Sequence, residues 1–262
     1  MKKVLTIAGS DSCGGAGIQA DLKTFSALGV YGMSVITAVT AQNTQGVFGV
    51  EEISPDMVAK QLDAVFQDIL VDAVKVGMVF STGIIEVIAD RLKKYNIQKV
   101  VLDTVMVSKS GCHLLRSESI KALIDLLIPK AYVVTPNLYE AKMLTGISVH
   151  TLQEMQEAAR KIYNMGAKNV VVKGGHRIED ATDILYDGSK FYHFPGHRID
   201  TKNTHGTGCT FSSAIASYLA LGHRVDEAVK KSKEYITGAI ANSLDIGKGV
   251  GPTNHFYKFD FK

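Results

Sequence analysis

The sequence predicts an α/β fold, a three-layer sandwich in which helices cover both faces of a mostly parallel central sheet. Short apolar runs rich in valine and isoleucine alternate with longer segments whose apolar residues recur every three or four positions. This alternation is typical of β–α–β units, which build parallel sheets between two helical layers. The sequence contains no internal repeat, low-complexity stretch or linker. We therefore expect a single domain over residues 1–262.

The first half of the chain alternates between strand and helix patterns. Residues 4–8 form a short apolar run, the pattern of a buried strand, and residues 14–28 show helical spacing. Ser54 suits the N-cap of a helix, and Pro55 suits its first turn. By the same patterns, strands are expected at residues 30–41, 73–76 and 99–102, and helices at residues 55–70, 81–95 and 117–127.

The second half contains the clearest hairpin signal and ends in two long helices. The pair Asp187-Gly188 lies between two short strand patterns, at residues 183–186 and 190–194. Further strands are expected at residues 132–135 and 170–173, and helices at residues 137–144, 151–165, 208–221 and 225–244.

The end of the chain gives two weaker predictions. Lys230, Lys231 and Lys233 are spaced as the solvated face of the last helix. Residues 249–262 have no periodic pattern, so we expect them to form a C-terminal tail.

Composition excludes several classes of protein. With 46% hydrophobic residues and a formal charge of only +3, the chain is neither disordered nor a dedicated nucleic-acid binder. No segment approaches the roughly 18 consecutive apolar residues of a membrane helix. Three cysteines, Cys13, Cys112 and Cys209, cannot form a disulfide framework. Scattered cysteines in odd number are typical of a reducing compartment, so we expect a cytoplasmic protein without a membrane or nucleic-acid partner.

Polar and glycine-rich segments follow many of the predicted strands. In a parallel α/β sheet, ligands bind beyond the carboxyl ends of the strands, which meet at one edge. The segments in question lie at residues 9–17, 42–44, 77–78, 103, 137 and 173–175. We therefore expect a binding site along this edge.

The first glycine loop, Gly14-Gly15-Ala16-Gly17, opens a predicted helix and resembles a loose dinucleotide fingerprint. That fingerprint needs an acid about twenty residues further on, and residues 24–50 contain neither Asp nor Glu. A small-ligand or phosphate loop is favoured, and a purely structural turn stays open. Asp21, one helical turn further on, could accept a hydrogen bond from a ligand or could interact with the positive end of the helix.

The second glycine loop, at residues 204–210, opens the helix expected over residues 208–221. Gly206 and Gly208 allow the backbone to approach a ligand, and the free N–H groups of a helix start favour an anion. Cys209 lies at this helix start, where the dipole should lower the pKa of its thiol and allow it to act as a base or nucleophile. The alternative is a small buried side chain without a chemical role.

Four charged or polar residues follow the predicted strands or begin the next helix. Asp103 and Glu140 carry the oxygen ligands that Mg²⁺ prefers, and Lys173 could reach a phosphate group. Asn137 with Glu140 also forms a good ordinary helix start. His205 beside the second glycine loop could bind a phosphate or serve a structural role.

Taken together, these motifs resemble the hydroxymethylpyrimidine/phosphomethylpyrimidine kinases of thiamine biosynthesis, a family of the ribokinase-like superfamily. The resemblance covers essentially the whole chain, and its collinear motifs are far more specific than either glycine loop alone. It rests on the segments at residues 6–11, 14–21, 41–44, 101–106, 135–137, 173–176 and 203–210.

The resemblance implies an ATP-dependent kinase. It would phosphorylate the 5-hydroxymethyl group of an aminopyrimidine and then convert the monophosphate into the diphosphate used for thiamine. By this likeness Gln42 should contact the edge of the pyrimidine, and Gly9, Asp21, Met78 and Val105 should complete the pocket.

The resemblance also implies the phosphate-transfer residues, a requirement for Mg²⁺ and a homodimer. Asp103 and Glu140 match positions that serve the metal ion. The nucleotide contacts match Lys173, Asn137 and Thr207, and the catalytic anion hole matches Gly206, Gly208 and Cys209, with Lys173 beside it. Ribokinase has aspartate where this chain has Cys209, whereas the pyrimidine kinases have cysteine.

Two cysteines depart from the common pattern of this family. Cys13 stands where many relatives have serine, and Cys112 stands where an aspartate or a small residue is common. Both fall in loops expected near the site. Cys13 could therefore make the enzyme sensitive to oxidation, although neither residue changes the expected reaction.

Three other functions compete with this interpretation. A pyridoxal or pyridoxine kinase shares the fold, but the loop at residues 42–44 matches the pyrimidine enzymes. A pyrimidine-binding sensor without catalysis would need none of the four residues Lys173, Asp103, Glu140 and Cys209, so their joint presence argues against it. A dehydrogenase that binds NAD lacks the acid after the second strand.

Overall fold

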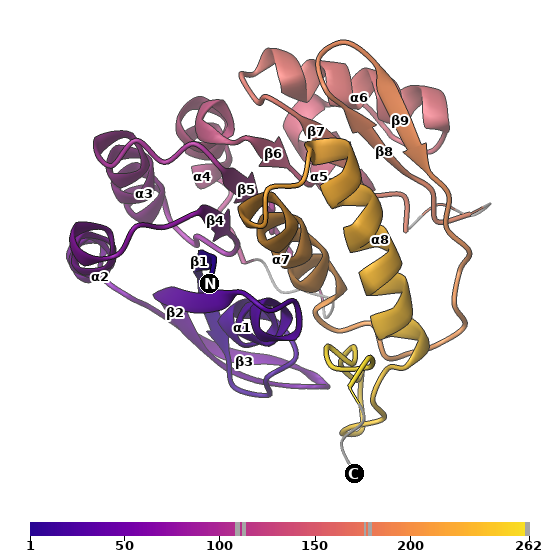
Figure 1. Cartoon of the computed structure of the whole chain (residues 1–262), viewed down its shortest axis with the longest axis horizontal. Helices are drawn as coiled ribbons and strands as arrows, with labels where there is room; N and C mark the ends of the chain where they lie inside the picture. Colours follow the sequence, from indigo (N-terminus) through magenta and orange to yellow (C-terminus); the bar gives the residue numbers. More distant parts are fainter. Residues whose placement is uncertain (108–110, 112–113, 176, 178–179, 260–262) are drawn as a thin grey trace.

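In the computed structural model, the described residues are 1–107, 111, 114–175, 177 and 180–259, and their nine strands form one sheet (Figure 1). The strands are β1 (Lys3–Asp11), β2 (Tyr31–Asn43), β3 (Gly46–Glu52), β4 (Ala73–Val76), β5 (Val100–Leu102), β6 (Val133–Val134), β7 (Val170–Val172), β8 (Asp183–Tyr186) and β9 (Phe191–Phe194). Their order in the sheet is β3-β2-β1-β4-β5-β6-β7-β8-β9. Neighbours from β2 to β7 are parallel, and the strands at both ends pair antiparallel.

Helices cover both faces of this sheet, as the sequence predicts. The helices are α1 (Gly17–Ala27), α2 (Pro55–Asp68), α3 (Thr82–Lys94), α4 (Ser119–Ala122), α5 (Leu138–Thr145), α6 (Leu152–Asn164), α7 (Thr207–Ala220) and α8 (Val225–Ala241). Side chains of α1, α7 and α8 share one buried cluster with Val101 and Val171, whereas those of α2, α3 and α6 pack with Val100 and Val172 on the opposite face. Successive strand residues point to opposite faces, which explains why these central strands are apolar throughout.

Hydrogen bonds between neighbouring residues define two elements that the sequence predicts, the start of α2 and the hairpin of β8 and β9. The Ser54 side chain accepts a hydrogen bond from the Met57 N–H at 3.3 Å, so it caps α2 as expected. The hairpin of β8 and β9 is confirmed, and the Asp187 carboxylate accepts hydrogen bonds from the N–H groups of Ser189 and Lys190 in its turn. Short-range hydrogen bonding of this kind depends on neighbouring residues alone.

Two predictions about secondary structure were incomplete. No strand was expected at residues 46–52, yet β3 pairs antiparallel with β2 there. Gly46 and Gly49 interrupt the apolar pattern of this short edge strand, and pairing with β2 overrides that weak local preference. The helix expected at residues 117–127 is α-helical only over Ser119–Ala122 and continues as a π-helix over Leu123–Leu127.

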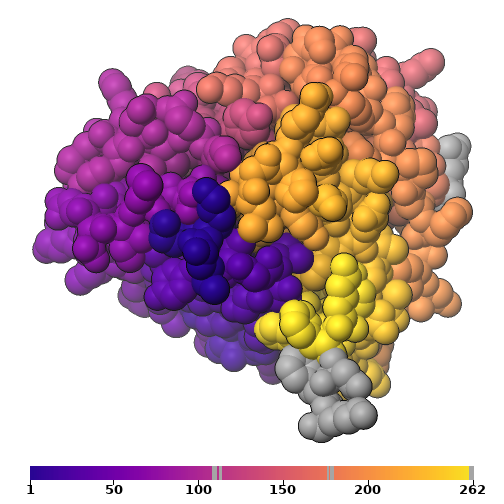
Figure 2. Space-filling view, viewed as in Figure 1, coloured from indigo at the N-terminus to yellow at the C-terminus, as the bar shows by residue number. Residues whose placement is uncertain are grey.

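The prediction of a tail at residues 249–262 was wrong for its described part. Thr253 is 1% exposed and His255 is 4% exposed. The Tyr235 hydroxyl donates to the carbonyl oxygen of His255 at 2.7 Å, and the ring of His255 contacts the Thr210 hydroxyl on α7 at 3.0 Å. Figure 2 shows this yellow segment seated between the indigo N-terminal part of the chain and the orange last helices. The segment therefore supports the start of α7.

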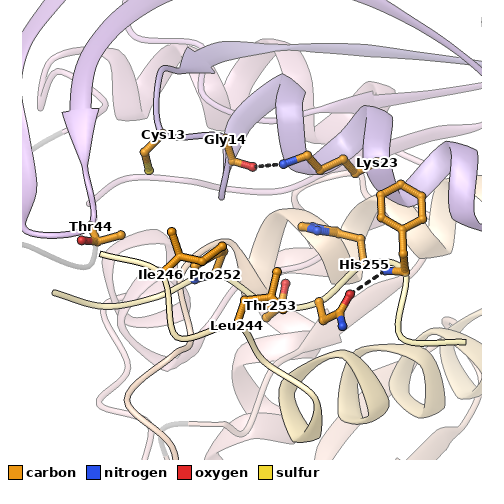
Figure 3. A pocket seen from close by; sticks show the side chains of 11 residues that line it. Cys13, Gly14, Lys23, Thr44, Leu244, Ile246, Pro252, Thr253 and His255 are labelled. Atoms are coloured by element: carbon orange, nitrogen blue, oxygen red, sulfur yellow. Dashed lines mark hydrogen bonds between the residues drawn. The ribbon is translucent and has the colours of Figure 1, made fainter. Parts of the chain in front are cut away.

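A small cavity of about 150 Å³ lies between the first glycine loop and this C-terminal segment (Figure 3). Cys13 and Gly14 line one side, and Pro252 and His255 line the other. The Lys23 ammonium donates to the carbonyl oxygen of Gly14 at 2.8 Å, which steadies the loop from outside. None of the helices in the described part of the chain is long and apolar enough to cross a membrane.

Candidate active site

A cavity of about 1040 Å³ lies at the edge where the parallel strands end. Its position agrees with the general rule that ligands bind beyond the carboxyl ends of such strands. The expected site residues that line it are Gly9, Gln42, Met78, Asp103, Val105, Asn137, Glu140, Lys173, Gly206, Thr207, Gly208 and Cys209. Residues from seven segments of the sequence therefore meet around one cavity.

The two glycine loops touch each other through their backbones. Gly206 caps α7 with a φ of 76°, and a Cβ there would lie 1.7 Å from the carbonyl oxygen of Gly15. Gly17 has a φ of 55°, and a Cβ there would lie 2.3 Å from the carbonyl oxygen of Gly9. A side chain at Gly206 would push the two loops apart, and one at Gly17 would push the first loop away from the end of β1. These close approaches are a stronger requirement for glycine than turn geometry alone.

The start of α7 faces the charged residues of the cavity. A Cβ on Gly208 would lie 3.5 Å from the Lys173 ammonium and 3.6 Å from the Asp103 carboxylate, so the backbone here is open toward both. Thr207 begins the helix, and its hydroxyl donates to the Thr204 carbonyl oxygen at 2.7 Å. The first N–H groups of a helix have no partners within it, and with the helix dipole they favour an anion.

Lys173 and Asp103 form an ion pair at the centre of the cavity, with 2.8 Å between the ammonium and the carboxylate. The Asp103 side chain is 2% exposed and also accepts hydrogen bonds from the hydroxyls of Thr135 and Ser212. Burial opposes its negative charge, but Lys173 and Lys75 outweigh that effect and hold the pKa of Asp103 below its usual value. Asp103 is therefore an ionised carboxylate in the lining of the cavity, and its charge suits a cation.

Glu140 and Asn137 serve the local structure as well as the cavity. The Asn137 side chain accepts from the Glu140 N–H at 2.9 Å, and Glu140 accepts from the Asn137 N–H at 2.8 Å, a complete capping box for α5. Burial raises the pKa of Glu140 to about 7, although Lys173 opposes the shift, and the negative charge of Asp103 adds to it. Two neighbouring buried carboxylates suit a divalent cation, because it would relieve their repulsion.

Asp21 does not line the cavity, so the expectation of a direct contact with the ligand needs correction. Its side chain is 0% exposed, and its carboxylate binds the Lys75 ammonium at 2.9 Å and the hydroxyls of Thr6 and Ser213 at 2.6 and 2.7 Å. Burial raises the pKa of Asp21 and by itself would lower the pKa of Lys75. The Asp21 carboxylate outweighs burial at Lys75, so the pKa of Lys75 lies above its ordinary value. We treat the pair as ionised, because three donors surround Asp21.

Sequence reasoning missed Lys75, which lines the floor of the cavity. The signal was present, because Lys75 interrupts an apolar strand of four residues in which every side chain is buried. Lysine is almost never fully buried without a partner, so a lysine in such a strand requires a buried acid. The identity of that acid depends on the packing of α1 against the sheet.

The expected activation of Cys209 by the helix dipole is also corrected. Burial raises the pKa of Cys209 to about 11, and the negative charges of Asp21 and Asp103 add to the shift, although Lys75 opposes it. The cost of desolvating a thiolate exceeds the benefit of the helix start. Cys209 is therefore a thiol at neutral pH.

One end of the cavity combines apolar walls with an amide. Met78 is 7% exposed, and a Cβ on Gly9 would lie 3.0 Å from its sulfur, so Met78 can approach only because residue 9 is glycine. Val105 lines the same cavity. The amide of Gln42 lies 3.3 Å from the ring of His205. A flat ring with polar groups on its edge would fit between such walls.

The other end of the cavity is lined by α8. Lys233, expected on the solvated face of this helix, instead donates to the carbonyl oxygen of Ala181 and to the Asp183 carboxylate, at 2.6 and 2.8 Å. Its side chain is 14% exposed. The hairpin of β8 and β9 folds toward α8 and buries this face, which helical periodicity could not predict. Ile236 and Ile240 line the cavity beside it.

Of the two cysteines that depart from the family pattern, the structure describes only Cys13. Cys13 is an exposed free thiol whose sulfur lies 3.4 Å from the Asp11 carboxylate. Partial burial and this hydrogen bond raise the pKa of Cys13 to about 11, which argues against ready oxidation because the thiolate is the reactive form. Cys112 lies outside the described residues.

A helix start suited to an anion lies beside a buried lysine–carboxylate cluster, with apolar side chains in the same cavity. This combination is typical of the site of a phosphotransferase. The sequence model of the phosphomethylpyrimidine kinase family matches residues 11–254. The chain belongs to this family, and it is a kinase with a ribokinase-like fold.

Similar proteins agree with this assignment. The hydroxymethylpyrimidine/phosphomethylpyrimidine kinase of Bacillus subtilis (strain 168) is 49% identical over 256 residues, with 97% of this chain and 94% of that protein covered. The thiamine biosynthesis bifunctional protein ThiED of Geobacter sulfurreducens is 54% identical over 253 residues. That match covers 96% of this chain but only 52% of the Geobacter protein, so the chain spans about half its length.

A solved structure supplies the second comparison. The ADP complex of Bacillus subtilis pyridoxal kinase superposes with a TM-score of 0.92 at 45% identity, covering 98% of both chains. This similarity confirms the predicted fold class. It also shows that the same fold accommodates a nucleotide and serves a kinase named for a different vitamin.

Proposed function

We propose that the protein transfers a phosphoryl group from ATP to the hydroxymethyl group of 4-amino-5-hydroxymethyl-2-methylpyrimidine. It then phosphorylates the monophosphate to the diphosphate used in thiamine biosynthesis. The observation that carries this proposal is the single cavity in which Gln42 and Met78 lie at one end and Lys173 and Asp103 lie beside the start of α7. The curated relatives named for this activity support the choice of substrate.

The pyrimidine would lie between Met78 and Val105, with its amino edge on Gln42. An amide can donate to a ring nitrogen and accept from an amino group at the same time, which matches a 4-aminopyrimidine. Burial of a flat ring between apolar walls supplies affinity, and the amide supplies orientation. The hydroxymethyl group would then point toward Gly208 and Cys209.

The nucleotide would occupy the α8 end of the cavity, with its base near Ile236 and Ile240. Lys173, Asn137 and Thr207 would contact its phosphates. Asp103 and Glu140 would hold Mg²⁺, which when bound neutralises negative charge on the phosphate oxygens. The donor set fits the ion, because the pKa of Glu140 is raised by burial and by the neighbouring carboxylate of Asp103.

Transfer depends mainly on positioning and charge stabilisation, since phosphoryl transfer has a loose transition state. The N–H groups of Gly206, Gly208 and Cys209 would stabilise the charge on the transferred group, with the ammonium of Lys173 beside them. We propose that the hydroxyl proton passes to the thiolate of Cys209. Because the pKa of Cys209 is raised to about 11, this form is minor at neutral pH and grows as the pH rises.

Pyridoxal is the second candidate substrate, because the pyridoxal kinase of Bacillus subtilis shares the fold at 45% identity. The test is ATP consumption with Mg²⁺, measured separately with hydroxymethylpyrimidine, its monophosphate and pyridoxal. Turnover of the first two compounds, with weak turnover of pyridoxal, is the expected result. A preference for pyridoxal would assign the protein to vitamin B6 salvage, and binding of pyrimidine without turnover would make it a sensor.

A homodimer formed through the β3 edge of the sheet is part of the proposal. Phe48 on this strand is 71% exposed, and Val39 on the neighbouring β2 is 46% exposed. Exposed apolar side chains on an edge strand favour pairing with a second chain. We expect Phe48→Asp to lower the mass measured by light scattering from that of a dimer to that of a monomer. An unchanged dimer would move the interface elsewhere, for example to β9.

The cytoplasm is the expected location, because the reaction consumes ATP and because Cys13 and Cys209 are free thiols. Measurement of the protein in fractionated cells tests this location directly. Recovery with the extracellular or membrane fraction would contradict it.

A further inference from the structure

Asp11 organises the first glycine loop and also binds His205 from the second. Its carboxylate accepts hydrogen bonds from the N–H groups of Cys13, Gly15 and Ala16, at 2.9, 3.0 and 2.8 Å. The Nε2 atom of His205 lies 2.8 Å from the same carboxylate. Burial would raise the pKa of Asp11, but the hydrogen bonds from His205 and Cys13 outweigh it and hold that pKa below its usual value.

This arrangement determines which nitrogen of His205 carries a proton. An ionised carboxylate can only accept hydrogen bonds, so the atom facing Asp11 at 2.8 Å has to be a donor. Nε2 of His205 therefore carries hydrogen whether the ring is neutral or charged. The Nε2–H group is already directed at Asp11 and offers no lone pair to any other neighbour.

Gln42 lies against this same nitrogen, which limits the orientation of its amide. Gln42 Nε2 is 3.3 Å from His205 Nε2, and that contact would place two donors together. On the other side, the Thr40 hydroxyl has one proton for two acceptors, the Ser10 carbonyl oxygen at 2.9 Å and Gln42 Oε1 at 3.2 Å. The backbone carbonyl is the closer acceptor, so the amide oxygen has no donor there.

A half-turn of the amide resolves both conflicts. The Gln42 oxygen then accepts from the Nε2–H of His205, which it shares with Asp11, and the Gln42 NH₂ group donates to the Thr40 hydroxyl. Asn and Gln amides have nearly the same shape in both orientations, so hydrogen bonding decides between them. Each amide atom keeps one lone pair or one N–H group for a ligand in the cavity.

The ring of His205 is held firmly enough to impose this orientation. Its backbone N–H donates to the Gly251 carbonyl oxygen at 3.0 Å. A Cβ on Gly15 would lie 2.3 Å from the ring, so the first loop closes directly against it. His205 is 9% exposed, and neighbouring segments therefore leave it little freedom to turn.

We propose that His205, held by Asp11, is a specificity-positioning residue that directs the Gln42 carbonyl toward itself and the Gln42 NH₂ group toward Thr40. The inference rests on the proposed contact between Gln42 and the pyrimidine. An amide free to rotate accommodates either an amino group or a carbonyl group on the ring. A clamped amide accepts only the substrate whose donor and acceptor come in the matching order, which selects 4-amino over 4-oxo pyrimidines.

The test compares kcat/KM for 4-amino-5-hydroxymethyl-2-methylpyrimidine with that of its 4-oxo counterpart. In the unaltered protein the ratio should be on the order of 100, because the 4-oxo ring leaves buried polar groups unpaired. His205→Ala should reduce the ratio to about 10 or less by freeing the amide to rotate. His205→Gln, whose amide N–H can reach Asp11, should restore most of it.

The ratio compares two substrates on one variant, so a general loss of activity or folded protein cancels. His193→Ala is the matched control, because His193 is exposed on β9 and does not line the cavity. It should leave the ratio unchanged. An unaltered ratio in His205→Ala would overturn the inference.

A second measurement does not depend on turnover. Long-range proton–nitrogen NMR spectra of the full chain should show hydrogen on Nε2 of His205 at neutral pH, and an unprotonated Nε2 would overturn the inference. Absence of phosphoryl transfer to both pyrimidines would instead contradict the proposed function. Calorimetric binding of the two compounds would then measure the same selectivity without catalysis.

Discussion

The buried ion pair of Lys75 and Asp21 allows a direct test of how much its two charges stabilise the protein. Both side chains are 0% exposed, and their charged atoms lie 2.9 Å apart. Lys75→Met removes the ammonium group while keeping a long, flexible apolar side chain in its place. Asp21 would retain its hydrogen bonds from Thr6 and Ser213 but would lose its only countercharge among the described ion pairs.

The expected loss is about 3–5 kcal/mol of the free energy of unfolding, the usual result of removing one partner from a buried pair. The exposed pair of Lys60 and Asp56 is the contrast, because its side chains are 67% and 74% exposed. Lys60→Met should change the free energy of unfolding by less than about 0.5 kcal/mol, since solvent screens such a pair.

Urea unfolding followed by circular dichroism measures both effects. Lys75→Met should lower the urea concentration at the midpoint of unfolding. It should not change the slope of the free energy of unfolding against urea concentration, because the surface exposed on unfolding is nearly the same. The double variant Lys75→Met with Asp21→Asn should recover much of the loss, because no charge is then left unpaired. A loss below about 1 kcal/mol in Lys75→Met, or a double variant as unstable as the single one, would refute the reasoning.

Three further predictions concern the start of α7 and the segment behind it. Gly206→Ala should abolish turnover and destabilise the protein by more than about 2 kcal/mol, because its Cβ would lie 1.7 Å from a backbone oxygen. Activity assays and thermal unfolding measure the two effects. A stable, active variant would contradict the close contact between the two glycine loops. In the unaltered protein kcat should rise from pH 7 to 9, because the thiolate form of Cys209 becomes more populated. Cys209→Ala should lower turnover strongly, nearly retain ATP affinity and remove this rise. A flat pH profile of kcat in the unaltered protein would exclude the thiolate as the base. Burial lowers the pKa of His255 to about 4, so the unfolded chain binds the proton more readily and stability should fall as the pH drops from 6.5 toward 4, by up to about 3 kcal/mol. His255→Gln should reduce this loss in urea unfolding at the two pH values, and equal losses would assign the effect to other groups.

Much of the architecture follows from the sequence alone. Apolar runs and helical periodicity predict the alternation of strands and helices, and residues such as Ser54 and Asn137 set helix starts through contacts a few positions away. Because parallel strands end at one edge, position in the chain was enough to bring Gln42, Asp103 and Lys173 to the same cavity. Glycine at positions 206 and 208 indicated a close approach of the backbone before any partner was known.

Tertiary structure alone decided what several of these residues do. Local patterns place a side chain on an element, whereas burial and charge depend on segments far away in the chain. Packing of α1 against β1 and α7 buries Asp21 away from the cavity, where it pairs with Lys75 of β4. Desolvation reverses the expected pKa shift of Cys209, because the cost of burying a charge depends on everything packed around it. Lys233 is a partly buried partner of Asp183 for the same reason, since periodicity cannot indicate which strand folds back over a helix.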